Sequence, residues 1–574
     1  MSSDPDRTRL AVLAVVAAAV LVRVAGLGDR PFHWDEARVG YWTLRYVETG
    51  VHEYRPIAGG PLVYLLGGRT LAVFGASDFV ARLPVAIASG LVPAAALAFR
   101  EHLRDDETVA VAVVLAFAPP LVRYGRFLRG DVLAAGAALV AVGWLLRWVT
   151  VSTDGREADS EDAFDALGPD RHLYAGVAAW VIAFGFSGFA VATLVLVLAG
   201  ALVAVDHDRI DGGDTSTGLA ERSAAAGRWL HARATPLARA VFVLLGTWAV
   251  VFAPRGDGVA RALANPIGFA RTTFREPVAV FVGVRVLGRE GTEFLPFVTD
   301  AISTALVTAG PLLAVAVGGL LADRYGLIEP ARRRHRRVVL FASAWAGLGL
   351  IGYPVVATVA APWTSVHVLV PAAIPAGVGL AAIYRYGRGE RGFTRSEADG
   401  DRRAARAAVA TLLLAAVAIH GAVVVLDDVA TSPSPDGRFA QYGQPADDLE
   451  PLVGEMETAL ASVDSPNDRV VWVGERYVAS DESALDRPPI EAESDRAAFG
   501  ERLPMAWYVE RTGAETAAVA RPGDLEGEPA VVIADPAHEG TLSERLSNHR
   551  TRTVRLGLWN REVVVFLAGS GPGS

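Results

Sequence analysis

Two adjacent carboxylates, Asp35 and Glu36, are the residues of this sequence that most resemble catalytic groups. They lie in the segment Pro31–Arg38 (PFHWDEAR), directly after the first long apolar run. Ionisable groups at membrane level usually have a functional or a pairing role. A carboxylate there could accept a proton from an acceptor hydroxyl while a lipid-linked leaving group departs. The structural alternative is that Asp35 caps a helix beginning near Glu36.

A second polar cluster is the segment Arg123–Asp131 (RYGRFLRGD). Its arginines are spaced at i, i+3 and i+6, so Arg123, Arg126 and Arg129 could lie along one side of a helical turn. Guanidinium groups placed in this way can bind phosphate. Tyr124 and Asp131 belong to the same candidate site. The alternatives are an interfacial anchor for the arginines and a plain helix N-cap for Asp131.

A third feature combines Trp363 with His367, near the start of an apolar segment on the same predicted face of the membrane. Both residues are candidates for the substrate site. A lone histidine in such a place can instead be a structural residue whose ring is satisfied by its neighbours.

Long apolar segments must position these three clusters. The chain has 574 residues, of which 52% are hydrophobic, and the apolar residues fall in discrete blocks, which predicts a polytopic helical membrane protein. A break at Gly185, Ser187 and Gly188 divides one long block into a hairpin of two helices. Eleven spans are predicted: Leu10–Leu27, Leu83–Phe99, Val109–Leu121, Val132–Val149, Leu173–Phe184, Phe189–Val205, Ala238–Phe252, Ala301–Leu321, Val338–Val355, Val366–Ile383 and Ala407–Leu426.

The distribution of arginine predicts the orientation of the spans. The short apolar stretch Pro61–Phe74 contains Arg69 and is interpreted as an interfacial helix. With eleven spans and a cytoplasmic N-terminus, the basic loops Arg324–Arg337 and Tyr384–Arg406 both lie in the cytoplasm, as the positive-inside rule requires. The C-terminal part of the chain is then extracellular, on the same side as Asp35.

The C-terminal part reads as a separate α/β domain. We expect a transmembrane domain over residues 1–430, a linker rich in Pro, Ser and Gly over 431–444, and an acidic domain over 445–574. Asp448–Ala461 and Pro504–Arg511 read as helices. Strands are expected at Arg469–Val473, Ala530–Ala534, Thr553–Gly557 and Val563–Leu567, the last two joined by a turn around Asn560.

Charge and cysteine usage exclude several classes of site. The sequence has no Cys, so disulfides, thiolate zinc sites and a cysteine nucleophile are excluded. It also has no Lys, and from Asp427 onward it carries 27 acidic against 13 basic residues, a net charge of −14. This balance is typical of a protein exposed to very high salt, although a GC-rich genome could also produce an acidic soluble domain.

Several motifs together resemble a known superfamily. The segments concerned are Asp35-Glu36, Pro61–Leu66, Phe79–Pro84 and Tyr124–Asp131. They resemble the GT-C membrane glycosyltransferases of the protein O-mannosyltransferase and aminoarabinose-transferase type. A narrower likeness is to an archaeal family labelled flippase-activity-associated and tied to the Agl N-glycosylation pathway; it rests on Tyr353-Pro354, Pro362-Trp363, His367, Val471–Glu475 and Leu503–Tyr508.

This resemblance implies a polyprenyl-phosphate-linked sugar donor, a glycan or protein acceptor, and a reaction outside the cytoplasm. Carried over by motif, Asp35 is the general base, Glu36 is the second carboxylate, and Arg126 and Arg129 bind the lipid phosphate. The oligosaccharyltransferase branch uses a separated Asp-x-Asp pair and a divalent metal. Because the carboxylates are adjacent here, the prediction is no metal and no other cofactor, with no nucleic-acid partner.

Two other functions remain open. A flippase, or a factor that assists the flipping of dolichol-phosphate sugars, would need the same phosphate-binding groove without a base. A secondary transporter would show internal repeats or paired broken helices, and the sequence has neither.

Overall fold

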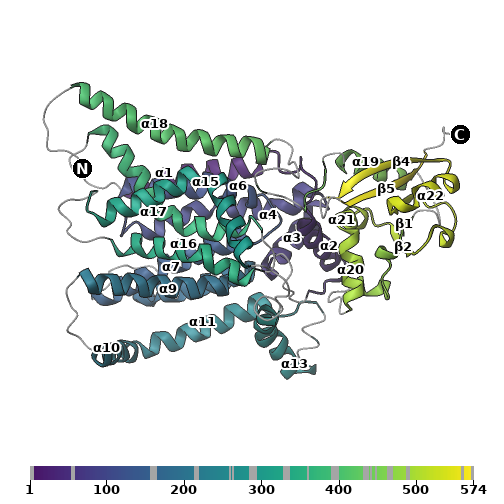
Figure 1. The fold of residues 1–574 in the computed structure, drawn as a ribbon. Helices are drawn as coiled ribbons and strands as arrows, with labels where there is room; N and C mark the ends of the chain where they lie inside the picture. Colours follow the sequence, from purple (N-terminus) through teal and green to yellow (C-terminus); the bar gives the residue numbers. More distant parts are fainter. Residues whose placement is uncertain are drawn as a thin grey trace.

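The computed structural model describes residues 5–52, 59–154, 165–211, 219–256, 260, 264–283, 294–327, 336–357, 361–389, 400–430, 439, 443–446, 449–461, 469–485, 492–556 and 561–569. Long helices run roughly side by side, and a smaller domain containing the sheet lies at one end of them (Figure 1).

The helical part contains a mixture of long helices and short helices. The long ones form the bundle, and α2 and α3 lie at the end of the bundle next to the small domain (Figure 1). The helices are α1 (Pro5–Val24), α2 (Trp34–Thr49), α3 (Pro61–Phe74), α4 (Asp78–Gly90) with η1 (Val92–Phe99), α5 (Asp105–Phe117), α6 (Pro119–Tyr124), α7 (Asp131–Asp154), α8 (Arg171–Phe186), α9 (Phe189–Asp211), α10 (Leu219–Ala232), α11 (Ala234–Phe252), α13 (Pro266–Ala270), α14 (Glu276–Phe281), α15 (Phe294–Arg324), α16 (Arg337–Val356), α17 (Thr364–Arg388) and α18 (Gly400–Val425).

Within the described ranges, eight helical segments are long and apolar enough to cross a membrane. They are α4 with η1, α7, α9, α11, α15, α16, α17 and α18. The remaining three predicted spans are helical too, as α1, α5 and α8. However, α5 has 13 residues and α8 has 16, and α1 carries four charged side chains among its 20 residues. The chain is therefore a polytopic helical membrane protein. Eight of the eleven predicted spans meet this criterion of length and composition, and the total number of spans stays a prediction.

Two local predictions agree with the structure. The predicted hairpin is present, because α8 ends at Phe186 and α9 begins at Phe189. The stretch Pro61–Phe74 forms α3, a helix of 14 residues that is too short to be counted as a span.

The bundle has two distinct ends. Figure 1 shows the N-terminus at one end, here called the N-terminal end, and α2, α3 and the sheet domain at the other, here called the domain end. At the N-terminal end, Arg385 binds Asp106 at 2.6 Å and Glu107 at 3.0 Å. Arg336 binds the same Glu107, and its Nε lies 2.6 Å from Asp323. These ion pairs join α5, α15, α16 and α17.

The small domain is built on a five-stranded mixed sheet in the order β2-β1-β3-β5-β4. Strand β1 is parallel to β2 and β3, whereas β5 is antiparallel to β3 and β4. Its elements are α19 (Leu449–Ala461), β1 (Arg469–Val473), α20 (Glu493–Arg502), α21 (Met505–Glu510), β2 (Glu515–Val519), β3 (Val531–Ala534), α22 (Glu539–Arg545), β4 (His549–Leu556) and β5 (Arg561–Ala568).

The alternation of side chains along these strands divides the domain core into two layers. Val471, Val532 and Phe566 pack on one face of the sheet against Leu542 of α22. The other face packs against α19, α20 and α21, and its core continues into α2 and α3. The sheet domain is therefore attached to the bundle through a shared apolar core.

The sequence predicted four of the five strands and missed β2. Strand β2 (ETAAV) carries no apolar residue larger than valine and is only partly buried, so it lacks the apolar alternation of a strand. The pairing of β4 with β5 confirms the predicted hairpin, while the predicted turn around Asn560 lies outside the described residues. Most of the predicted linker 431–444 also lies outside them, and the three domain boundaries stay predictions.

Candidate functional site

The site begins at the N-terminus of α2, where the two adjacent carboxylates face different partners. His33 is the N-cap: its Nδ1 accepts a hydrogen bond from the backbone N–H of Asp35 at 3.1 Å. Glu36 completes a capping box by accepting from the backbone N–H of His33. The cap is thus made by His33 and Glu36. The N-cap role that was considered for Asp35 is filled by His33.

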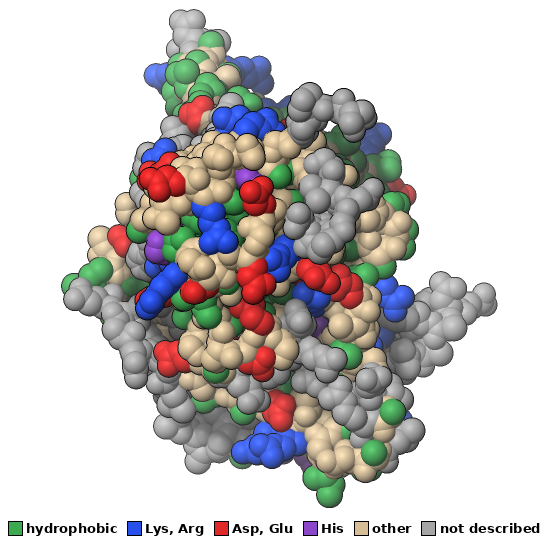
Figure 2. Space-filling model, turned by 90° about the vertical axis from the view of Figure 1, so that its right-hand side faces the viewer, with side chains coloured by type: hydrophobic (Ala, Val, Ile, Leu, Met, Phe, Trp, Pro, Cys, Tyr) green, Lys and Arg blue, Asp and Glu red, His purple; other side chains and the backbone are tan. Residues whose placement is uncertain are grey.

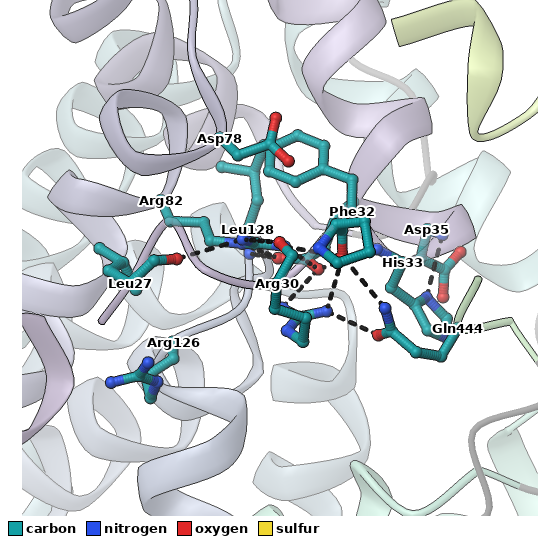
Figure 3. Close-up of polar contacts among 12 residues, drawn as sticks. Leu27, Arg30, Phe32, His33, Asp35, Asp78, Arg82, Arg126, Leu128 and Gln444 are labelled. Carbon is teal, nitrogen blue, oxygen red and sulfur yellow. Dashed lines mark hydrogen bonds and ion pairs between the residues drawn. The ribbon is translucent and has the colours of Figure 1, made fainter. Parts of the chain in front are cut away.

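Glu36 is fully buried and saturated with donors. Arg82 of α4 donates to both of its oxygens, at 2.8 and 2.9 Å. Arg30 donates at 2.7 Å and the backbone N–H of Leu128 at 2.9 Å. Figure 3 shows these groups converging from three segments of the chain. Because two carboxylate oxygens have about four acceptor positions, the Glu36 side chain has no position left for a substrate proton.

Asp35 faces the opposite way and has fewer donors. Arg38 donates to its Oδ1 at 2.8 Å, and Arg129 donates to its Oδ2. The side chain retains 11% of its exposure, whereas that of Glu36 retains none. Of the two predicted carboxylates, Asp35 is therefore the one that a substrate could approach.

Arg129 is fixed between two carboxylates and an indole ring. Its Nε donates to Asp131 at 2.8 Å, and its guanidinium lies 4.0 Å from the ring centroid of Trp363. Asp131 also accepts from Ser187 at 3.4 Å and lies 3.5 Å from Nε2 of His367. The structure brings Asp35, Arg129, Asp131, Trp363 and His367 into one connected group.

Arg126 donates to backbone carbonyls at the end of α1. Its guanidinium donates to the carbonyls of Val22 and Arg23 at 3.0 and 3.3 Å, and to that of Gly26 at 2.7 Å. These carbonyls belong to the C-terminal end of α1, where no helical N–H groups remain to pair with them. Arg126 therefore caps α1, and little of its donor capacity is available for phosphate.

Arg123 is the least satisfied of the three predicted arginines. It is 3% exposed, donates from Nη1 to the backbone carbonyl of Asp428, and has a buried Nε without a hydrogen-bond partner. Its guanidinium lies 5.4 Å from the ring centroid of Phe127 and 5.1 Å from that of Phe439. Tyr124, the next residue, is buried against Phe127, Trp363 and Phe439. Within the described residues Arg123 makes no ion pair.

Arg30, which the sequence did not single out, lies on Phe127 as well. Its guanidinium is 4.1 Å from the Phe127 ring centroid. It also donates to Gln444 at 2.7 Å, and Gln444 in turn donates to the carbonyl of Pro31 (Figure 3). Two guanidinium groups therefore approach one aromatic ring, and only one of them has a carboxylate partner.

Three arginines at the domain end, Arg30, Arg123 and Arg126, have lowered pKa values. Burial lowers the pKa of Arg30 to about 9, with Arg82 contributing in the same direction. Burial likewise lowers the pKa of Arg123 and of Arg126. For Asp35, burial alone would raise the pKa, but Arg129 and Arg38 outweigh it and hold the pKa below its usual value. An anion at Arg123 would relieve the unfavourable burial of these cations.

An apolar groove of about 860 Å³ runs along the bundle. It is lined by α1, α5, α6, α15, α17 and α18. At the N-terminal end its wall includes Arg7, Asp106 and Tyr384, and at the domain end it includes Val122 and Val425. Val122 immediately precedes Arg123. Val425 lies three residues before Asp428, whose carbonyl accepts from Arg123. The domain end of the groove is therefore close to Arg123 along the chain on two helices, although Arg123 itself is not one of its lining residues.

Asp78, in the first turn of α4, anchors the sheet domain over this site, and its role could not be predicted from the sequence. Its carboxylate accepts from Trp507 Nε1 at 2.8 Å, from the Tyr508 hydroxyl at 2.9 Å and from Arg511 at 3.2 Å. Tyr508 also accepts from the backbone N–H of Phe32, whose ring stacks on Trp507. Trp507 and Tyr508, from the motif Leu503–Tyr508, therefore hold α21 against α4 and against Phe32, just before the start of α2.

The described residues contain no group of three or more His, Asp or Glu side chains that could hold a metal ion. The predicted absence of a metal and of other cofactors stays a prediction.

Comparisons with known proteins agree with this architecture. Residues 449–568 match the family described as the Agl23 flippase-associated protein C-terminal domain. No curated protein sequence matches the chain. Among solved structures, ArnT from Cupriavidus metallidurans bound to undecaprenyl phosphate is similar over 98% of this chain and 99% of its own, with 16% identity and a TM-score of 0.57.

A second similar structure is the oligosaccharyltransferase AglB from Archaeoglobus fulgidus, in complex with an inhibitory peptide and a dolichol-phosphate. It matches 92% of this chain and 70% of its own, with 14% identity and a TM-score of 0.51. At these identities the likeness concerns the fold. The chain has the GT-C membrane fold, with an Agl23-type domain at its C-terminus.

Proposed function

We propose that this protein is a membrane glycosyltransferase that transfers a sugar from a polyprenyl-phosphate donor, such as a dolichyl-phosphate sugar, to an acceptor outside the cytoplasm. The single observation that carries the proposal is the apolar groove whose wall at the domain end includes Val122, the neighbour of the buried Arg123. Its length suits an isoprenoid chain, and within the described residues the Arg123 guanidinium makes no ion pair. ArnT and AglB, which share the fold, were solved with undecaprenyl phosphate and dolichol-phosphate.

In the proposed reaction, the isoprenoid chain lies in the groove and the phosphate is bound by Arg123, with Arg30 on the other side of the binding region. Charge-assisted contacts to guanidinium groups stabilise the negative charge that grows on the phosphate as it leaves. Arg126 is omitted from this role because it caps α1, and Arg129 acts by orienting Asp35.

The group transfer uses Asp35 as the base. An acceptor hydroxyl oxygen forms a bond to the anomeric carbon while the bond from that carbon to the phosphate oxygen breaks, which inverts the anomeric configuration. The hydroxyl proton moves to the Asp35 carboxylate, and polyprenyl phosphate leaves with the electron pair. Although the ion pairs with Arg129 and Arg38 make Asp35 a weak base, the hydroxyl becomes strongly acidic as its oxygen bonds to carbon. A weak base that is ionised at neutral pH is then sufficient.

The proposal extends to orientation: the domain end faces outward and the N-terminal end lies in the cytoplasm. The arginine-rich loops at 324–337 and 384–406 support this orientation through the positive-inside rule. Protease added to intact cells should remove the sheet domain. Protection of the domain in intact cells, with digestion after lysis, would invert this orientation.

The direct test of function is sugar transfer in membranes. Purified full-length protein in liposomes is given tritiated dolichyl-phosphate mannose or dolichyl-phosphate glucose together with a membrane extract as the source of acceptor. Transfer that depends on the protein supports the proposal. Its absence with every donor would reject the enzymatic role.

A second candidate, a factor that assists flipping of dolichol-phosphate sugars, is favoured by one observation, the flippase-associated description of the C-terminal family. Such a factor needs the groove and Arg123 but no proton acceptor. Loss of glycosylation in an Arg123→Ala strain together with full glycosylation in an Asp35→Asn strain would support the helper.

A further inference from the structure

Two consecutive prolines interrupt a helix inside the bundle, where α5 gives way to α6. The interruption is at Ala118, whose ψ of 123° is not helical, and α6 then begins with Pro119 and Pro120. A proline has no N–H, so the carbonyls four positions earlier, those of Leu115 and Ala116, lose their usual helical donors. Both residues are fully buried, where an unpaired carbonyl is costly.

Arg23 of α1 supplies the missing donors. Its Nη1 donates to the carbonyl of Ala116 at 2.9 Å, and its Nη2 donates to that of Leu115 at 3.4 Å. The same two nitrogens also donate to the carbonyls of Ala19 at 3.1 Å and Leu121 at 3.3 Å. Because these four bonds use all the hydrogens of the two terminal nitrogens, the buried Arg23 is not itself a group that could bind phosphate.

The bond to Leu121 connects Arg23 to α6, the helix that carries Arg123. Leu121 precedes Arg123 by two residues. At the end of α6, Ser89 of α4 donates to the carbonyl of Gly125 at 2.8 Å. Gly125 has no room for a side chain, since a Cβ there would lie 2.7 Å from the Ser89 hydroxyl and 2.8 Å from Nε of Arg23. Arg23 and Ser89 therefore hold α6 from two neighbouring helices.

The connection between α1 and α6 is made in both directions. Arg126, which follows α6, caps the end of α1, and one of the carbonyls that it reaches is that of Arg23, at 3.3 Å. The same two segments contribute Val22 and Val122 to the wall of the apolar groove. These valines directly precede Arg23 and Arg123. The contacts between α1 and α6 therefore set the geometry of the groove beside Arg123.

From these contacts we infer that Arg23 is a positioning residue for the donor lipid: it holds the bend between α5 and α6 and so places Arg123 and the adjoining groove wall. The inference rests on the proposed function and adds a residue that the sequence did not single out. Without the bend, α6 would continue in the direction of α5 and Arg123 would be displaced. A misplacement of about 1 Å can cost about 10²-fold in an enzyme site.

The alternative is that Arg23 stabilises the fold without influencing the site. Both roles predict a lower melting temperature when Arg23 is replaced, because two buried carbonyls then lose their donors. Only the positioning role predicts that the folded variant binds the donor lipid more weakly. Affinity and stability must therefore be measured separately, with affinity determined at a temperature at which every variant is folded.

The test uses the full-length protein in detergent with dolichyl phosphate as the probe. Arg23→Met removes the donors and keeps a long unbranched side chain. Adding Pro119→Ala and Pro120→Ala to Arg23→Met returns two backbone N–H groups to the orphaned carbonyls, and this triple variant keeps the test decisive if Arg23→Met does not fold. Arg336→Met, which breaks buried ion pairs at the N-terminal end, is the matched control.

We expect Arg23→Met to lower the melting temperature and to weaken dolichyl phosphate binding by about tenfold to a hundredfold. The triple variant should recover the melting temperature, but its affinity should stay low because α5 and α6 then form one straight helix. Arg336→Met should lower the melting temperature and change the affinity by less than about twofold. Arg23→Met combined with Arg123→Ala should lose less affinity than the product of the two single losses, because Arg23 acts through Arg123.

Three results would overturn the inference: wild-type affinity in Arg23→Met, recovery of affinity together with the melting temperature in the triple variant, or losses that multiply fully when Arg23→Met and Arg123→Ala are combined. The first two would make Arg23 a residue of stability alone, and the third would separate it from Arg123. Failure of the proposed function has a different signature, namely binding of dolichyl phosphate that depends on Arg23 while the wild-type protein transfers no sugar.

Discussion

The two ends of the bundle use the same residue types for different purposes. At the N-terminal end, Arg385 and Arg336 each bind two carboxylates, and Glu107 is shared between them. At the domain end, Glu36 is likewise saturated, but Arg123 donates to a backbone carbonyl and makes no ion pair within the described residues. A buried Nε without a hydrogen-bond partner is found at both ends, in Arg123 and in Arg385. Saturated pairs fix helices against one another, because breaking one leaves an uncompensated buried charge.

This difference suggests how the binding site can be recognised. Charge alone does not identify it, because both ends contain buried arginines and carboxylates. The distinguishing property is a buried guanidinium without a carboxylate partner among the described residues, that of Arg123, which follows directly after Val122 in the wall of an apolar groove. A ligand that supplies an anion and a long apolar chain would complete both features at once.

The largest effect is expected for Asp35→Asn, which keeps the size of the side chain but removes its capacity to accept a proton. Loss of general-base assistance typically lowers the rate by about 10²- to 10⁴-fold. The measurement is sugar transfer by purified protein, with expression and membrane insertion as controls. Asp6→Asn, at an exposed position at the N-terminal end, is the matched variant and should leave transfer unchanged. Wild-type transfer by Asp35→Asn would remove Asp35 from the reaction.

The two saturated carboxylates should behave alike in a stability measurement. Glu36→Gln and Glu107→Gln each remove the charge from a buried network and should destabilise the fold by about 3–5 kcal/mol. Thermal unfolding in detergent measures both. If Glu36→Gln left the melting temperature unchanged and abolished transfer, Glu36 would be a reacting group and the contrast with Asp35 would fail.

The arginines of the segment 123–131 should separate into binding and structural residues. Arg123→Ala removes a charge-assisted contact and should weaken dolichyl phosphate binding by about tenfold to a hundredfold. Arg126→Ala uncaps α1 and should lower the melting temperature. The affinity of the folded variant for dolichyl phosphate should change little. The opposite pattern would return the phosphate to Arg126, as the family resemblance originally implied.

The loop at the domain end should lose stability in mild acid. Burial lowers the pKa of His33 to about 4, so its neutral form is favoured in the folded state. Because the folded pKa lies below the unfolded value near 6.5, this contribution is complete above about pH 6.5 and is lost as the pH falls toward 4. Between pH 7 and 5.5 the loss should be about 1 kcal/mol.

The control for this pH effect is His33→Asn, which can still cap α2 but does not titrate in this range. Melting temperatures of the wild type and of this variant are compared across the same pH series. An equal decline in both proteins would assign the acid sensitivity to groups other than His33.

The smallest effect is expected from salt acting on the sheet domain. Acidic side chains are interspersed with arginines on its outward face (Figure 2), and the chain from Asp427 onward carries a net charge of −14. The Debye length widens from about 3 Å at 1 M to about 10 Å at 0.1 M salt, so repulsion among the carboxylates grows as salt is removed. A melting temperature of the full-length protein that did not fall between these conditions would argue against adaptation to high salt.

Local patterns in the sequence determined the membrane helices and most of the small domain. Hydropathy predicted the helical segments, Gly185 and its neighbours predicted the break between α8 and α9, and alternation predicted four strands. These features depend on residues close together in the chain, so a sequence reveals them directly. Strand β2 escaped because its burial is incomplete and supplies no such pattern.

The roles of the charged residues were decided only by the tertiary structure. The sequence could not say that Glu36 would meet Arg82, 46 positions away, or that Arg123 would meet the carbonyl of Asp428, 305 positions away. Nor could it pair Asp78 with Trp507, 429 positions away. The sequence shows only arginine at each of these positions. It does not show whether the guanidinium caps a helix, orients a carboxylate or is available to a ligand. Only the partners supplied by distant segments distinguish them, because a buried charge is defined by what satisfies it.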